Sequence, residues 1–221
     1  MPTYQDPRPF DVEYIDNPSQ AELRELALAH TPSVQKTKVG SINKVSRNKA
    51  RMAKYTYIID TQPRWSAQTI EPAKAAELIE RQRQYIKDAG KLIAIDGYVG
   101  LGERALGSTW IYTHEGANIA GMQQILAFPR SDVENEAQLA EPFKPTFRLI
   151  YTPNLMLDDM PGRQAIIVDM ENWTTHVMGP DYFGESKKGV LRMLNHYVYE
   201  KGGLVLHAGA KAVSSEGGSI T

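Results

Sequence analysis

Two adjacent lysines and a later histidine are the side chains of this sequence that are best placed to form a charged site. Lys187 and Lys188 lie in a stretch that reads SKKGVLRMLNHYVYEKGGLVLH and ends on His207. Neighbouring residues of a helix lie about 100° apart around its axis, so the two lysines can serve different ligands rather than compete for one. In a first helical turn, unpaired N–H groups and the positive end of the helix dipole would add to their attraction for anions. The spacing therefore predicts an anion-binding site.

Two regular elements are expected to position these side chains. A helix is indicated by apolar residues that recur on one face, namely Val190, Leu191, Leu194 and Val198. Gly202-Gly203 is a typical end for such a helix, and residues 204–206 then read as a short core strand that carries His207. The alternative is that the lysines are solvated surface residues and His207 is a satisfied core histidine.

The rest of the chain predicts an α/β fold in which a mixed β-sheet is flanked by helices. Helices are expected at residues 19–29, 71–89 and 114–128, and strands at residues 55–59, 91–96, 108–113, 147–151, 165–169 and 173–178. Ser19 and Glu22 form a capping box, and Pro72 and Gly90 bound the clearest helix. Residues 1–18, with four prolines, read as an extended arm or cover.

A basic segment precedes the first of the central strands. Residues 31–53 contain no acidic residue and six basic ones, which are Lys36, Lys38, Lys44, Arg47, Lys49 and Arg51. Such a run is either a solvated face or a loop, anchored to the strand at 55–59, that binds an anion. The glycines at 100, 102 and 107 do not predict a dinucleotide site, because the third is wrongly spaced and a strand follows them.

Composition limits the class of protein. The chain has 221 residues, 42% hydrophobic and 23% charged, which is enough for one large domain with a substantial core. A net charge of −1 gives no broad electrostatic reason to expect nucleic acid or an anionic membrane as a partner. With no cysteine, disulfides, thiolate metal sites and cysteine nucleophiles are excluded. No secretory signal and no long apolar stretch is present, so a cytoplasmic protein is expected.

The lysine motif also resembles a known family. The order Tyr182-x-Gly184-Glu185-x-Lys187-Lys188-Gly189, with His207 nineteen positions after Lys188, is similar to the ATP-dependent phosphoenolpyruvate carboxykinases. The segment Arg51-x-x-Lys54-x-x-Tyr57-Ile58-Ile59 resembles the part of that family in which an arginine contacts the carboxylate substrate. The resemblance extends over residues 37–213 and implies the fold of the family's N-terminal, substrate-binding domain.

The resemblance implies a reaction and a role for each residue. Oxaloacetate and ATP would give phosphoenolpyruvate, carbon dioxide and ADP, a step of gluconeogenesis. Lys188 and His207 would bind a divalent metal, Mn²⁺ or Mg²⁺, and Lys187 would steady the developing enolate or phosphate. Tyr182 and Arg51 would orient the carboxylate and the departing carbon dioxide. Arg51, Lys187 and Lys188 are thus the expected catalytic residues.

Several positions depart from the family pattern. Thr-Gly and Ser-Pro normally flank the arginine, whereas this chain has Lys49-Ala50 and Met52-Ala53. Cys-Ser-Ala-Asn normally follows the histidine, whereas residues 208–211 here read Ala-Gly-Ala-Lys. These differences leave open a different small-molecule kinase on the same scaffold, and a non-catalytic relative that binds a dicarboxylate or a partner.

The sequence contains no G-x-x-x-x-G-K-[ST] loop, the element that holds nucleotide phosphates in P-loop enzymes. In the family this loop begins shortly after the stretch that corresponds to residues 213–221. We therefore expect an arm and helix at residues 1–36, a carboxykinase-like N-terminal domain at 37–213, and a tail at 214–221. That tail would lead toward a nucleotide-binding half, in cis or in trans, which would supply the ATP site and a third metal ligand.

Overall fold

The computed structural model describes residues 4–47, 52–61, 68–209, 213–215 and 218–220. Its helices are α1 (Gln20–His30), α2 (Pro72–Ala89), α3 (Ala117–Leu126), α4 (Glu136–Leu139) and α5 (Phe183–Tyr199). The main strands are β1 (Glu13–Asp16), β4 (Thr56–Ile59), β5 (Thr69–Ile70), β6 (Lys91–Val99), β7 (Leu106–Thr113), β8 (Phe147–Thr152), β9 (Ala165–Asp169) and β10 (Thr174–Met178). Two small hairpins complete the set, β2–β3 (Val34–Lys36 and Ile42–Lys44) and β11–β12 (Val213–Ser215 and Gly218–Ile220).

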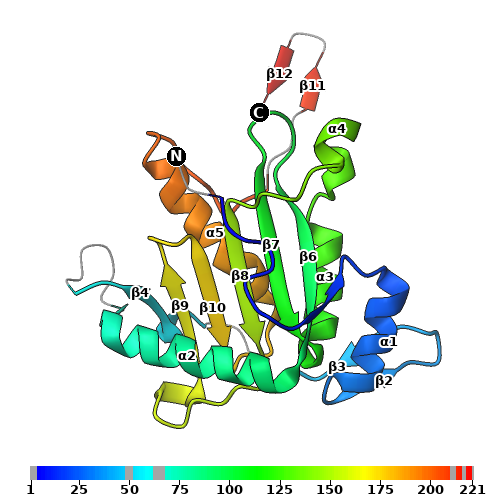
Figure 1. The fold of residues 1–221 in the computed structure, drawn as a ribbon. Helices are drawn as coiled ribbons and strands as arrows, with labels where there is room; N and C mark the ends of the chain where they lie inside the picture. The colour runs from blue at the N-terminus through cyan, green and yellow to red at the C-terminus, as the bar shows by residue number, and fades with distance from the viewer. Residues whose placement is uncertain (1–3, 48–51, 62–67, 210–212, 216–217, 221) are drawn as a thin grey trace.

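The main strands form one mixed sheet in the order β1-β6-β7-β8-β10-β9-β4-β5 (Figure 1). The pairs β6–β7 and β9–β10 are antiparallel, and the other neighbours run parallel. The mixed sheet flanked by helices confirms the fold class expected from the sequence. None of the described helices is long and apolar enough to cross a membrane.

Alternating side chains of the strands give the sheet two buried faces, each covered by a different set of helices. Trp110, Tyr112, Leu149 and Tyr151 face α1, α3 and α5 and form the larger core cluster. Ile111 and Ile150 face the other way and pack with Ile86 of α2 and with the N-terminal arm. In Figure 1, α2 crosses one face of the sheet and α5 lies on the opposite side.

The caps expected from sequence are present. The Ser19 hydroxyl accepts from the Glu22 N–H, and the Glu22 carboxylate accepts from the Ser19 N–H, so the capping box of α1 is complete. Gly90 ends α2 in the left-handed conformation with φ of 68°. Gly202 does so after α5, where its N–H donates to the Tyr199 carbonyl.

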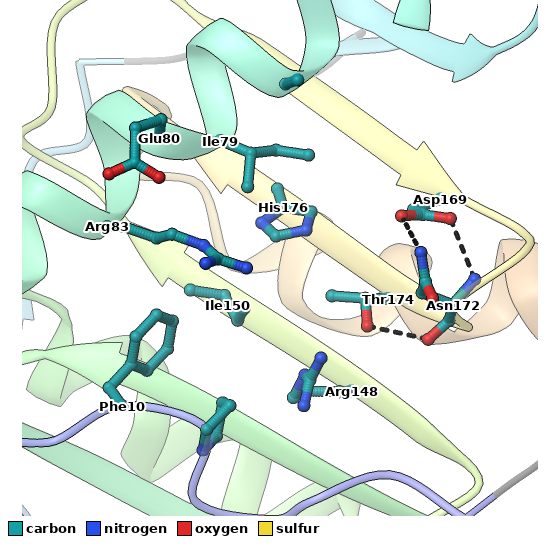
Figure 2. Close-up of a pocket in the computed structure, with 12 residues that line it drawn as sticks. Phe10, Ile79, Glu80, Arg83, Arg148, Ile150, Asp169, Asn172, Thr174 and His176 are labelled. Atoms are coloured by element: carbon teal, nitrogen blue, oxygen red, sulfur yellow. Dashed lines mark hydrogen bonds between the residues drawn. The ribbon is translucent and has the colours of Figure 1, made fainter.

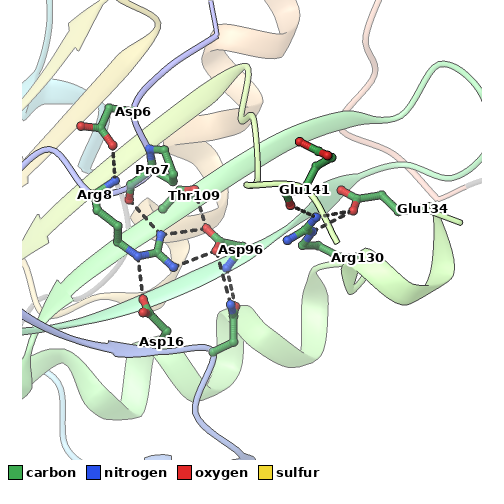
Figure 3. A network of polar contacts seen from close by, with 10 residues as sticks. Asp6, Pro7, Arg8, Asp16, Asp96, Thr109, Arg130, Glu134 and Glu141 are labelled. Atoms are coloured by element: carbon green, nitrogen blue, oxygen red, sulfur yellow. Dashed lines mark hydrogen bonds and ion pairs between the residues drawn. The ribbon is translucent and has the colours of Figure 1, made fainter. Parts of the chain in front are cut away.

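The N-terminal arm is more than a cover, because its residues 13–16 form an edge strand beside β6. Figure 3 shows how the arm is fixed to the sheet. The Arg8 guanidinium donates to both carboxylate oxygens of Asp96, at 3.1 and 2.8 Å, and to Asp16 at 2.6 Å. Thr109 and Asn17 also donate to Asp96, so this carboxylate joins the arm to β6 and β7.

One expected core strand is wrong. Residues 204–206 do not form a strand, and the side chains of Leu204 and Leu206 are 78% and 68% exposed. A strand needs a hydrogen-bonded neighbour, and no described strand pairs with this segment. The helix expected at residues 114–128 is present as α3, in which Ile119 is buried but Met122, Ile125 and Leu126 are exposed. The buried face of α3 consists instead of Ala117, Ile119, Ala120 and Gln123.

Candidate active site

The candidate site lies where parallel strands end. β7, β8 and β10 run in the same direction and finish at Thr113, Thr152 and Met178. α5 begins a few residues beyond β10, so its first turn lies at this edge of the sheet. In open α/β sheets, ligands bind in the crevice outside the carboxyl ends of the strands. The fold therefore brings the motif of residues 182–189 to an edge suited to a ligand.

Tyr182 is the residue that opens α5. Its carbonyl accepts from the Tyr151 hydroxyl at 2.9 Å, which ties the start of the helix to β8. Its ring folds back over the helix, so that a Cβ on residue 184 would collide with it. The glycine of the motif is thus required by the position of the tyrosine. The Lys188 ammonium lies 5.7 Å from the centre of the same ring.

A buried chain of hydrogen bonds lies beneath the motif. The hydroxyls of Tyr112 and Ser186 are 2.6 Å apart, and Ser186 donates to the Gln123 amide oxygen at 2.8 Å. All three residues are buried, and the chain joins α5 to β7 and α3. Burial raises the pKa of Tyr112, and that of Tyr151 well above its usual range. Both phenols therefore stay protonated and act as hydrogen-bond donors.

A second glycine of the motif sets the distance between α5 and the sheet. A Cβ on Gly189 would overlap the Leu149 side chain and approach Thr175 within 3.1 Å. The Thr175 hydroxyl also donates to the Gly189 carbonyl at 3.1 Å. Helix and sheet are therefore packed closely enough that the lysines next to Gly189 have a fixed location.

Lys187 and His207 line the same cleft, which has a volume of about 270 Å³. Most of its wall is apolar and comes from α3, α5, the end of β6 and the segment after α5. His207 is exposed, and Lys187 is half-buried. The two lysines thus diverge as the helical spacing predicts, because Lys188 contacts Tyr182. His207 therefore shares a cleft with Lys187, whereas Lys188, its expected partner in metal binding, lies against Tyr182. That Lys188 and His207 bind one ion stays a prediction.

Tyr182 lines a different cleft, of about 560 Å³, between α1, α3 and the β3 segment. Asp181 and Lys44 share this cleft and are both well buried. The Asp181 carboxylate accepts from the Arg47 N–H at 3.0 Å and lies 3.3 Å from the Lys44 ammonium. Part of the basic segment is therefore held against the first turn of α5 by Asp181.

Sequence reasoning missed Asp181, which had no signal beyond its place next to the motif. It also gave no role to Glu185, whose side chain is fully buried. The Arg192 guanidinium donates to Glu185 at 2.8 Å, yet the second carboxylate oxygen has no hydrogen-bond partner among the described residues. The seven-residue spacing of this pair, two helical turns, is the signal that could have found it.

Arg51, the expected carboxylate-binding arginine, lies outside the described residues. A short 3-10 helix follows it at Met52–Tyr55 and leads into β4. Within the described ranges, no group of three or more His, Cys, Asp or Glu side chains could hold a metal ion. The expected pair consists of an imidazole and an amine, nitrogen donors that suit Mn²⁺ better than the harder Mg²⁺. A metal ion bound by this pair would take its remaining ligands from water, substrate or other protein groups.

The chain is similar to phosphoenolpyruvate carboxykinases. The family model described as phosphoenolpyruvate carboxykinase matches residues 12–221. Over 154 residues the chain is 25% identical to the phosphoenolpyruvate carboxykinase (ATP) of Geobacillus thermodenitrificans (strain NG80-2). That alignment covers 68% of this chain and 28% of the relative, so the chain spans less than a third of the relative's length.

Proposed function

Because this chain belongs to the phosphoenolpyruvate carboxykinase family, whose model matches residues 12–221, we propose that it provides the carboxylate-binding part of an ATP-dependent carboxykinase. The reaction would convert oxaloacetate and ATP to phosphoenolpyruvate, carbon dioxide and ADP, as a cytoplasmic step of gluconeogenesis. The observation that carries the proposal is the position of Tyr182, Lys187 and Lys188 in the first turns of α5, at the edge where β8 and β10 end.

This position suits an anionic substrate. A carboxylate at the first turn of α5 would meet unpaired N–H groups and the positive end of the helix dipole, together with the ammonium of Lys187. The Tyr182 hydroxyl could donate to the substrate, and Arg51 could hold the carboxylate through two parallel hydrogen bonds. As decarboxylation places negative charge on the enolate oxygen, Lys187 would stabilise that charge.

Lys188 and His207 are the residues that we propose as metal ligands in this chain. The bound Mn²⁺ or Mg²⁺ would offset the charge of the enolate and of the phosphate that approaches it. The lysine would bind as the neutral amine, since only that form has a free electron pair. In this structure Lys188 lies over the Tyr182 ring and Lys187 shares the cleft of His207, so metal binding would require the Lys188 side chain to turn from the ring toward His207.

The nucleotide site is proposed to lie in another segment, because these 221 residues contain no P-loop motif. Phosphoryl transfer depends on holding the phosphates in line with the acceptor oxygen. We therefore expect no tight ATP binding and no formation of phosphoenolpyruvate by this chain alone. Adding a nucleotide-binding half should restore metal-dependent activity, whereas robust turnover by the chain alone would reveal a different nucleotide site.

Calorimetry with oxalate, a stable dicarboxylate, in the presence of Mn²⁺ would test the carboxylate site. Lys187→Ala should weaken oxalate binding about tenfold, because it removes a charged hydrogen bond. Arg51→Lys should also weaken binding, since it keeps the charge but loses the fork geometry.

The matched control is Lys201→Ala, because Lys201 lies over the Tyr197 ring at the other end of α5, 4.7 Å from its centre. Equal oxalate affinity in Lys187→Ala and Lys201→Ala would contradict the proposed site. Binding of oxalate without turnover in the presence of a nucleotide-binding half would indicate a non-catalytic relative.

A further inference from the structure

A second polar pocket lies on the opposite face of the sheet from α5. It has a volume of about 420 Å³ and lies between α2, the N-terminal arm and strands β8 and β10 (Figure 2). Its apolar wall includes Phe10, Ile79 and Ile150. Pockets of this size accommodate small ligands, and a few convergent polar groups usually fix the ligand's orientation. Neither the carboxykinase motif nor the basic segment contributes a residue to it.

Two arginines enter this pocket from different elements. Arg148 comes from β8, where its Nη1 group donates to the Asp6 carbonyl at 3.0 Å. Its Nε group is buried and has no hydrogen-bond partner among the described residues. Figure 2 shows that Arg83 extends from α2 toward His176 and Ile150. The two cations face a shared space, since both line this pocket. Burial lowers the pKa of Arg148, and the charge of Arg83 lowers it further.

His176 adds a hydrogen-bond acceptor to the pocket floor. The Gln82 amide nitrogen donates to the Thr152 hydroxyl at 3.1 Å, so its oxygen is the group that meets His176 Nδ1 at 2.7 Å. The network assigns the proton to Nδ1, which leaves the electron pair on Nε2. Burial lowers the pKa of His176 to about 3, and the ring is neutral at physiological pH.

The acidic groups of the pocket do not neutralise both arginines. The Asp169 carboxylate accepts from the Asn172 N–H at 2.9 Å and from its side-chain amide at 2.8 Å, so it is held on the β9–β10 turn. Glu80 and Arg83, two described residues of α2, both lie on its exposed side and line the pocket, but no ion pair joins them. The Thr174 hydroxyl is committed to the Asn172 carbonyl at 3.0 Å. The groups left to meet a ligand are the Arg83 guanidinium, the Nε group of Arg148 and the imidazole acceptor of His176.

We propose that this pocket binds a small oxyanion, a carboxylate or phosphate that also carries a hydroxyl group. The anionic oxygens would accept from Arg83 and Arg148, including the Nε group that lacks a partner, and the hydroxyl would donate to His176 Nε2. The carbon part would lie against Phe10 and Ile79. The site is separate from the candidate active site and does not depend on the proposed function.

Titration calorimetry at fixed ionic strength, with inorganic phosphate, glycerate and 3-phosphoglycerate as probes, would test the pocket. Glycerate carries only a carboxylate and inorganic phosphate only a phosphate, so comparing their affinities shows which of the two anions the pocket binds. All titrations would use the Lys187→Ala chain, so that binding at the candidate active site is reduced. At least one probe carrying a hydroxyl should bind with a millimolar or lower Kd. Arg83→Ala should weaken the binding of that probe about tenfold.

Two further variants make the test specific. Ala76→Phe keeps every charge but fills the pocket from the exposed side of α2, and it should abolish binding. Lys87→Ala removes an exposed charge from the same helix outside the pocket and should leave the Kd within about twofold. The proposal is overturned if no probe binds below 10 mM, or if Arg83→Ala and Ala76→Phe bind as tightly as Lys87→Ala.

Discussion

The Lys188 ammonium lies 5.7 Å from the centre of the Tyr182 ring, and the ring occupies the space that a side chain on residue 184 would need. One motif lysine is therefore turned toward Tyr182, while its neighbour Lys187 lines the cleft that contains His207. The glycine between Tyr182 and the lysines makes this arrangement possible. The motif therefore supplies charged groups, and the position of its glycine also meets a packing requirement.

Gly184→Ala should displace the Tyr182 ring without unfolding the protein. The ring is half-buried and can swing toward the cleft, so the melting temperature should change little. Oxalate binding should weaken, because Tyr182 and Lys188 would both lose their present positions. Calorimetry measures the loss, and unchanged oxalate affinity would show that the position of Tyr182 does not matter for the ligand.

Gly189→Ala should destabilise the fold, although alanine is the better helix former. The added Cβ overlaps the Leu149 side chain, and such overpacking costs about 1–3 kcal/mol. The matched control is Gly121→Ala in α3, where the new Cβ would meet Leu23 at an ordinary distance of 3.8 Å. That change should stabilise the protein by about 0.5–1 kcal/mol. Urea unfolding measures the change in the free energy of unfolding for both variants. A change in the same direction for both would contradict the close packing of α5.

The features that the sequence predicted well are those set by local chemistry. The Ser19 capping box and the Gly90 end were predicted because each satisfies backbone groups within a few residues. The start at Pro72 was predicted because proline has no N–H that needs a partner and has a φ suited to the first helical turn. Six of the eight strands of the sheet, β4 and β6–β10, were predicted because buried strands need apolar, β-branched runs. The edge strands β1 and β5 are short and were not expected. The divergence of Lys187 and Lys188 followed from helical geometry alone.

The features that sequence missed depend on contacts between distant segments. Asp181 meets Lys44 across more than 130 residues, and nothing in the local pattern of either one marks the pair. Apolar content alone misplaced residues 204–206, because a strand forms only where a neighbouring edge is available.

Arg8→Ala should destabilise the fold by about 3–5 kcal/mol, since it leaves the Asp96 carboxylate buried without its main cation. The Asp96 side chain is only 6% exposed, and the bidentate contact fixes the arm to the sheet. Arg8→Lys should recover part of this loss, because the charge remains but one of the two hydrogen bonds does not. Asp16→Asn is the control and should have a much smaller effect, as Asp16 is largely exposed. Similar losses for Arg8→Ala and Asp16→Asn would argue against this network.

Stability should fall as the pH drops below about 6.5, partly because of His176. Its pKa is lowered to about 3 in the fold, so the unfolded chain takes up the proton first. Its stabilising contribution is complete above the unfolded pKa and is lost as the pH falls from there toward 3. Between pH 7 and pH 5 this one group should cost about 2 kcal/mol. His176→Asn retains a hydrogen-bond donor for Gln82. In urea unfolding, this variant should lose about 2 kcal/mol less stability than the wild type between pH 7 and pH 5. An unchanged pH dependence would mean that His176 can be charged within the fold.

Asp181 and Lys44 should be strongly coupled in their effect on stability. Asp181→Asn leaves a lysine that is only 10% exposed without its partner, which should cost about 3–5 kcal/mol. Adding Lys44→Met should recover much of that loss, because the uncompensated charge is then gone. Lys74→Met, which removes a pair with the exposed Asp159, should change stability far less. A double-mutant cycle in urea measures the coupling, and additive losses would show that Lys44 is solvated. Oxalate binding should weaken in Asp181→Asn and recover little in the double variant, because neither variant has the ion pair between Asp181 and Arg47, whose Nε lies 3.4 Å from the carboxylate. This difference between stability and binding would separate the role of Asp181 in positioning the basic segment from its role in balancing a buried charge.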